Sequence, residues 1–168
     1  MFSIKTTFLT AIMGLSVAYA QDFNPKYANE FLNMGVGADA LGMGSAVVAD
    51  VQGLTAGVWN PAGLLQQTQQ TEIGLMHASY FGGLAAFDHL GISRRVQPQT
   101  VVALNLVRLG VDNIYNTTQL IDNQGNIDYS QLQTFNSADY ALIGSIGKPT
   151  KVQNLSIGFS AKVLYRHI

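Results

Sequence analysis

The sequence predicts an all-β fold: an antiparallel transmembrane β-barrel, with about five strands present, preceded by a Gly/Ala-rich N-terminal plug. Three observations carry this prediction. After residue 71, several segments alternate between apolar and polar side chains over roughly ten residues, the length that a tilted strand needs to cross a bilayer. Residues 31–64 combine seven glycines with apolar side chains. Only 11% of the 168 residues are charged, against about 25% in soluble domains.

Residues 1–20 are typical of a secretory signal peptide. Lys5 supplies the positive charge, residues 8–17 form an apolar core, and Ala18-Tyr19-Ala20 predicts cleavage after Ala20. The alternative is an uncleaved anchor helix, but the apolar run is shorter than the ~20 residues of a membrane span. The chain has no cysteine, which excludes a lipoprotein, and its net charge of −1 gives no reason to expect a nucleic-acid partner.

Residues 21–65 are expected to form the plug, after a polar lead-in up to residue 30. Each glycine costs a helix roughly 1 kcal/mol relative to alanine, so a continuous helix is unfavourable here. The segment is nevertheless too apolar for a solvated linker. These two facts together predict a compact, irregular, buried segment, with one short helix near 46–56 and a turn at Asn60-Pro61.

Residues 66–168 are expected to form the first strands of the barrel, after a polar linker at 66–71. The predicted strands are 72–80, 86–96, 100–109, 138–147 and 154–166. They are joined by turns at 81–83, 97–99 and 148–153 and by a long polar insertion at 110–136. Because outer-membrane barrels have short periplasmic turns and longer outer loops, the insertion is expected to face outward.

The side chains on these strands must suit their surroundings. A charge facing lipid at the midplane costs about 2–4 kcal/mol, so strand cations should face the lumen or lie at strand ends. Aromatic rings favour the membrane interface, which makes the strand tyrosines candidates for an aromatic girdle. The cations concerned are Arg94, Arg95, Lys162 and Arg166, and the tyrosines are Tyr80, Tyr140 and Tyr165.

Five strands cannot close a transmembrane barrel, because about eight is the smallest number that leaves no open edge in lipid. We therefore expect the sequence to be an N-terminal fragment, or a truncated product, of a protein roughly twice as long. A soluble exported β-sandwich is a further alternative for a charge-poor secreted chain.

Several motifs occur in a characteristic order along nearly all of the expected mature chain. They are Phe31-Leu32, Gly37-Ala38, Leu41-Gly42-Met43-Gly44, Ala49-Asp50, Trp59-Asn60-Pro61-Ala62-Gly63-Leu64, Met76-His77-Ala78, the run from Arg108 to Ile114, Ser137-Ala138-Asp139-Tyr140 and Lys162-Val163-Leu164-Tyr165. This ordered set resembles the PorV/PorQ family, a branch of the FadL-like outer-membrane β-barrels.

The resemblance implies a location in the outer membrane and a role as a component or adaptor of type IX protein secretion. It implies outer-membrane lipid as a partner, together with type IX secretion components or cargo proteins. The FadL-like branch as a whole implies an alternative, a passive transporter of hydrophobic small molecules.

The plug motif comprises Trp59, Asn60, Pro61 and Ala62. Trp59 is expected to pack against the inner wall of the barrel, with its indole N–H bonded there. Asn60 can brace the turn through backbone bonds, and Pro61 fixes the turn's direction. The motif either shifts to open a path for a ligand or acts as a permanent stopper, and the sequence leaves both readings open.

Arg108 and Asp112 are the candidate residues of the barrel rim. They either pair to hold the outer loop over the barrel mouth or stand as two solvated charges, worth ~0–1 kcal/mol as a pair. No catalytic or metal site is predicted, because His77, His89 and His167 are isolated in the sequence. No cofactor is expected either, since the Gly-x-Gly runs at 35–37 and 42–44 lack the strand and helix of a nucleotide site.

Overall fold

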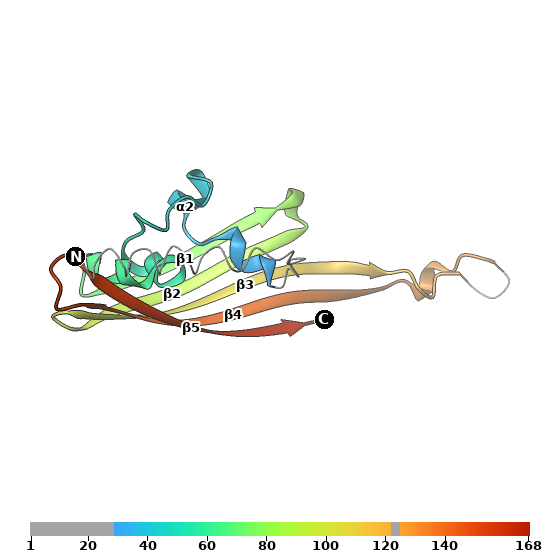
Figure 1. Ribbon diagram of the computed structural model, residues 1–168. Helices are drawn as coiled ribbons and strands as arrows, with labels where there is room; N and C mark the ends of the chain where they lie inside the picture. Colours follow the sequence, from blue (N-terminus) through green and yellow to red (C-terminus); the bar gives the residue numbers. More distant parts are fainter. Residues whose placement is uncertain (1–28, 122–124) are drawn as a thin grey trace, which may run out of the picture.

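The computed structural model describes residues 29–121 and 125–168. The expected signal peptide and its cleavage point after Ala20 lie outside these residues. The fold is mostly β: five antiparallel strands form one open sheet in the order β1-β2-β3-β4-β5. Residues 29–66, called the N-terminal segment below, lie along one face of this sheet (Figure 1). Among the described residues, no helix has the length and hydropathy needed to span a membrane.

The strands confirm the predicted alternation. They are β1 (Thr71–Tyr80), β2 (Ala85–Gln97), β3 (Thr100–Asn116), β4 (Gln133–Pro149) and β5 (Ser156–His167). Each strand pairs with the next along the chain, and the β1–β2 turn is the short 3-10 helix η4 (Phe81–Gly83). All five strands are longer than the five or six residues that are commonest in globular proteins.

The insertion at 110–136 differs from the expected loop. Strands β3 and β4 continue well into it. The pairing shifts between Val111 and Ile114, where Asn113 adopts the left-handed conformation with φ 58°. Its backbone N–H donates to Asn136 Oδ1 at 2.9 Å. This β-bulge lets the two strands continue past the irregular residues, and the hairpin projects beyond the rest of the sheet (Figure 1).

A short 3-10 helix, η5 (Tyr129–Gln131), lies near the far end of this hairpin. The side-chain hydroxyl and the backbone N–H of Ser130 both donate to Asp128 Oδ1, at 2.6 and 2.9 Å. These bonds stabilise the ionised carboxylate and hold the pKa of Asp128 below its usual range.

The N-terminal segment is irregular, as predicted, but its helices lie elsewhere. It contains η1 (Glu30–Met34), α2 (Ala38–Gly42), η2 (Gly53–Thr55), α3 (Ala56–Trp59) and η3 (Pro61–Gln66). The expected helix at 46–56 is wrong: residues 43–50 form turns. Gly53, inside the expected range, has a φ of 65°, so no continuous right-handed helix can cross it. The short helices η2 and α3 instead follow one another from this residue to Trp59.

Two apolar clusters join this segment to the sheet. The first comprises Phe31, Val36, Phe87, Val107, Ala141 and Ile143. The second comprises Leu54, Ala56, Leu64, Val101 and Ala103. Each cluster combines side chains from the N-terminal segment with side chains from the strands. Burial of this apolar surface, at about 25 cal/mol per Å², is what holds the segment on the sheet.

The stretch at 66–71, expected to be a polar linker, is instead held against β2. Gln67 is buried, and its Oε1 accepts a hydrogen bond from Ser93 Oγ at 2.6 Å. Arg95 Nη2 donates to the carbonyl oxygens of Leu65 and Gln67, at 3.2 and 2.7 Å. The polar side chains of this stretch thus bond strand residues rather than water alone.

Candidate functional site

The two faces of the sheet differ in chemistry. We call the face that contacts the N-terminal segment the covered face, and the opposite one the open face. On the open face, residues that are directly opposite each other on successive strands form rows across the sheet. One row is Leu75, Leu90, Leu106, Leu142 and Val163, and the next is Ile73, Ile92, Leu104, Gly144 and Ala161. Their exposure reaches 79% for Leu75 and 71% for Ile73.

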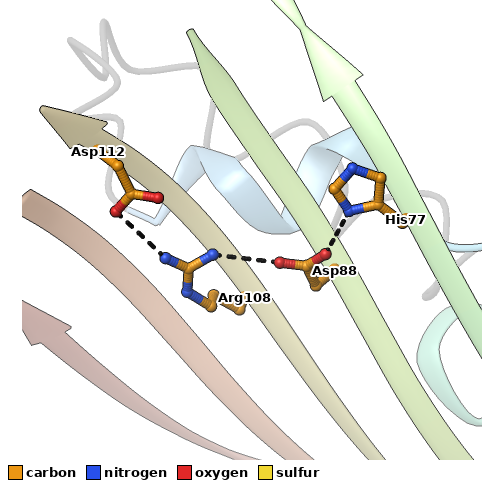
Figure 2. Close-up of polar contacts among 4 residues, drawn as sticks. All are labelled: His77, Asp88, Arg108 and Asp112. Carbon is orange, nitrogen blue, oxygen red and sulfur yellow. Dashed lines mark hydrogen bonds and ion pairs between the residues drawn. The ribbon is translucent and has the colours of Figure 1, made fainter. Parts of the chain in front are cut away.

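A polar row borders these aliphatic rows on the open face. It consists of His77, Asp88, Arg108, Tyr140 and Tyr165, one from each strand. His77 Nδ1 lies 2.7 Å from Asp88 Oδ1, and Arg108 Nη1 donates to Asp88 Oδ2 at 3.2 Å (Figure 2). The rings of Tyr140 and Tyr165 lie side by side, with their centroids 6.2 Å apart.

The structure brings the two candidate rim residues together. Arg108 Nη2 lies 3.6 Å from Asp112 Oδ1, which is an ion pair within one strand (Figure 2). The closer partner of Arg108 is Asp88 on β2, which sequence reasoning missed. We call His77, Asp88, Arg108 and Asp112 the polar cluster. The sequence did carry a signal for its face: Asp88 lies two and four residues before Leu90 and Ile92 on β2, so it points to the same side of the strand.

The other strand cations singled out in the sequence lie on the covered face of the sheet or near the end of a strand. Lys162 and Arg166 lie on the covered face, where Arg166 Nε donates to Asp139 Oδ1 at 2.5 Å. Arg95 also points to the covered face, and Arg94 lies on the open face close to the end of β2.

Only part of the predicted girdle fits the open face. Tyr140 and Tyr165 lie on it, as the girdle requires. Tyr80 does not, because it lies on the covered face and packs edge-on against Phe87, with ring centroids 6.5 Å apart. The parity of Tyr80 on β1, opposite to that of His77, accounts for this difference.

On the covered face, backbone groups of the N-terminal segment bond side chains of the strands. The carbonyl oxygen of Gly57 accepts from Ser145 Oγ at 2.6 Å and from Ser160 Oγ at 3.2 Å. The N–H of Leu54 donates to Glu72 Oε2 at 2.9 Å. These bonds tie the segment to β1, β4 and β5, so it spans the sheet from one edge strand to the other.

Glycines let the segment approach the strands closely. A Cβ on Gly57 would lie 2.9 Å from Asn105 Nδ2, and one on Gly147 would lie 2.7 Å from the Pro61 carbonyl oxygen. Such separations are too short for non-bonded atoms, so these positions have no room for a side chain. Glycine thus permits close contact on both partners, in the segment at Gly57 and on β4 at Gly147.

Within the plug motif, Trp59 bonds the segment itself and not the wall. Its Nε1–H donates to the carbonyl oxygen of Val36 at 2.9 Å, which corrects the expected bond to the sheet. The six-membered ring lies over Gly35, where an added Cβ would come within 2.7 Å of Cη2. The chain folds back on itself here, so the indole reaches a carbonyl between η1 and α2, 23 residues earlier, rather than a strand.

Asn60 braces the turn through backbone bonds, as expected. Its Nδ2 donates to the carbonyl oxygen of Val48 at 3.0 Å, and its Oδ1 accepts from the N–H of Ala62 at 3.3 Å. Pro61 is the first residue of η3, a position that suits its fixed φ and missing N–H. These contacts fix the turn that rests on β4 and β5.

Buried polar groups also line the covered face. His89 Nε2 lies 2.8 Å from Asn105 Oδ1, and both side chains are buried. Asn105 Nδ2 has no hydrogen-bond partner in the structure. Over residues 29–121 and 125–168, no group of His, Asp or Glu side chains is arranged to hold a metal ion. Comparison with protein families, curated proteins and solved structures finds no match for this chain.

Proposed function

We propose that this chain forms the first strands of an outer-membrane β-barrel protein of PorV/PorQ type, a component or adaptor of type IX protein secretion. The observation that carries the barrel is the open face: its leucine row crosses all five strands with aliphatic side chains that remain exposed. A soluble protein rarely leaves an apolar surface of this extent uncovered. Contact with lipid hydrocarbon accounts for it.

The height of the apolar region supports the same proposal. On β4, the open-face residues between Tyr140 and Lys148 are Leu142, Gly144 and Ile146. Eight residues of an antiparallel strand rise about 27 Å. With a tilt of about 40°, this corresponds to a height of about 21 Å, close to the ~25 Å apolar band of outer-membrane barrels. Closure requires about eight strands at least, so the proposal needs further strands beside β1 and β5.

In this barrel, the covered face lines the lumen and the N-terminal segment is the plug. The role in type IX secretion rests on the resemblance of the motifs and not on the geometry. The alternative of a passive transporter for hydrophobic molecules calls for an apolar lumen. On β5, the covered face instead carries Ser160, Lys162 and Arg166, which argues against an apolar lumen and so against the transporter.

Cell fractionation tests the barrel. We expect the protein in the outer-membrane fraction, released by detergent and not by carbonate or salt. Recovery in the soluble periplasm would refute the barrel and support an exported β-sandwich.

Gene deletion tests the secretion role separately. Cells that lack the intact gene should retain type IX cargo in the periplasm, and a plasmid copy should restore secretion. Unchanged secretion combined with reduced uptake of a hydrophobic compound would instead support the transporter.

A further inference from the structure

The polar cluster is a charged feature on a face that is otherwise largely aliphatic. It lies beside the leucine row on β1, β2 and β3, and the adjacent Tyr140 and Tyr165 extend it across β4 and β5. Charged groups are costly against hydrocarbon, so their position on this face needs a physical reason.

We propose that the polar cluster, together with Tyr140 and Tyr165, contacts the headgroups of one lipid leaflet and thereby sets the depth of the sheet in the membrane. This inference rests on the proposed function, because it requires the open face to meet lipid. It goes further by assigning the boundary between headgroups and hydrocarbon to particular side chains.

The cost of charge as a function of depth supports this assignment. Moving an arginine from the bilayer midplane to the interface recovers about 1–4 kcal/mol, since the cost falls from about 2–4 kcal/mol to about 0–1 kcal/mol. The cluster holds Arg108 between the carboxylates of Asp88 and Asp112, so several charges favour the same depth. Tyrosine also favours the interface, where its ring is apolar and its hydroxyl is hydrated.

The cluster keeps part of its charge accessible. The side chains of Arg108, Asp88 and Asp112 are 28%, 40% and 52% exposed. Mutual pairing lowers the cost of facing an environment of intermediate polarity, and the exposed edges can bond the phosphate and the ammonium group of a zwitterionic headgroup. Carboxylates and a guanidinium side by side match a headgroup that carries both charges.

A groove joins the cluster to the leucine row. Its volume is about 420 Å³, and its lining includes Leu75, Leu90 and Leu106 at one end and Asp88 and Arg108 at the other. This amphipathic lining fits the first part of an acyl chain and the headgroup attached to it. On the opposite side of the apolar rows lie Arg94 on β2 and Lys148 on β4. Polar side chains therefore border the apolar rows on both sides along the strand direction.

The experiment measures depth with a fluorophore on a single introduced cysteine, and residues 1–168 contain no cysteine that would compete for the label. The reporter stands at Leu75, next to the cluster, or at Leu104, two rows away from it. The intact protein is reconstituted into phosphatidylcholine vesicles that contain lipids with a nitroxide on the headgroup or midway along the acyl chain. The ratio of headgroup to chain quenching reports the depth of each position.

The test variant combines Asp88→Asn with Arg108→Met, which removes the main ion pair without leaving one charge alone. The matched control combines Asp139→Asn with Arg166→Met, an ion pair in the adjacent row on the covered face. A milder variant, Tyr165→Leu, retains the ion pair and tests the same row if the double variant fails to fold.

In the unmodified protein, we expect headgroup quenching to dominate at Leu75 and chain quenching to dominate at Leu104. The test variant should lower the quenching ratio at Leu75 at least twofold, Tyr165→Leu should lower it by a smaller factor, and the control should leave it unchanged. An unchanged ratio in the folded test variants, or an equal fall in the control, overturns the depth assignment while leaving the barrel intact. Absence of quenching at Leu104 in the unmodified protein overturns both proposals, because the open face would then be covered by protein or water.

Discussion

Replacement of Gly158 by alanine tests how closely the N-terminal segment rests on the sheet. Gly158 lies on the covered face of β5, and an added methyl group would overlap the backbone of Pro61 and Ala62 and lie 2.8 Å from Pro61 Cβ. Carbon atoms that are not bonded prefer separations of about 3.5–4.0 Å. The turn must therefore move away from β5 by about 1 Å to accommodate the methyl group.

The expected loss of stability has two parts. Overpacking against backbone that cannot rotate away costs about 1–3 kcal/mol. The same displacement strains the bonds that Ser145 and Ser160 donate to the Gly57 carbonyl, each worth about 1 kcal/mol. We therefore expect Gly158→Ala to lower the free energy of unfolding by about 2–4 kcal/mol.

Urea unfolding of the reconstituted protein, followed by the fluorescence of Trp59, measures this loss because Trp59, the one tryptophan among residues 1–168, belongs to the displaced segment. Gly144→Ala is the control: it lies on the open face of β4, and an added Cβ there meets no atom within 4 Å. We expect its effect to stay within about 0.5 kcal/mol. Equal unfolding midpoints for the two variants would refute the close contact between the segment and β5.

Single hydrogen bonds of the N-terminal segment give three further tests. Ser145→Ala removes a buried donor to the Gly57 carbonyl and should lower the free energy of unfolding by about 1–2 kcal/mol. In urea unfolding, this loss lowers the midpoint and leaves the slope constant. An unchanged midpoint would show that the bond contributes nothing. Trp59→Phe keeps most of the ring but loses the N–H donated to Val36, so limited proteolysis should cut the segment faster than in the unmodified protein, and equal rates would contradict the bond. Glu72→Gln retains an acceptor oxygen for the backbone N–H that it bonds, so its thermal midpoint should fall less than that of Glu72→Ala, and equal falls would argue against this role.

The strands could be predicted because their side chains alternate in a way that the pleat requires. In β5, Ile157, Phe159, Ala161 and Val163 share one face, as their spacing of two predicts. The ends of β3 and β4 could not be predicted in this way. A bulge at Asn113 changes the parity of the strand, and polar residues beyond it look like a loop while they still pair across the hairpin.

The N-terminal segment was predictable in kind but not in detail. Its glycine content excludes a long helix, and the structure has several short ones. The position of each turn depends on φ at single residues. Ser45 adopts a positive φ, which is uncommon for serine and cannot be predicted from its residue type. The bond of Trp59 to Val36 was missed for a related reason, since it depends on how the chain folds back and not on the local pattern.

The polar cluster shows how much of the candidate site could be predicted from the sequence. Arg108 and Asp112 could be singled out from the sequence, but their pairing could not, because four residues of a strand span about 13 Å. Asp88 reaches Arg108 from a different strand, through a register that the sequence does not state. A slip of one residue would turn Asp88 to the covered face, so knowledge of the pairing is required before this contact can be inferred.

The two hydroxyl groups that hold the Gly57 carbonyl have a consequence for the order of folding. Ser160 follows Gly57 by 103 residues. Docking of the N-terminal segment on β4 and β5 therefore closes a long loop, and it belongs to the late steps of folding. Contacts so distant along the chain also slow folding in general, so refolding from urea should recover strand structure before the native environment of the tryptophan.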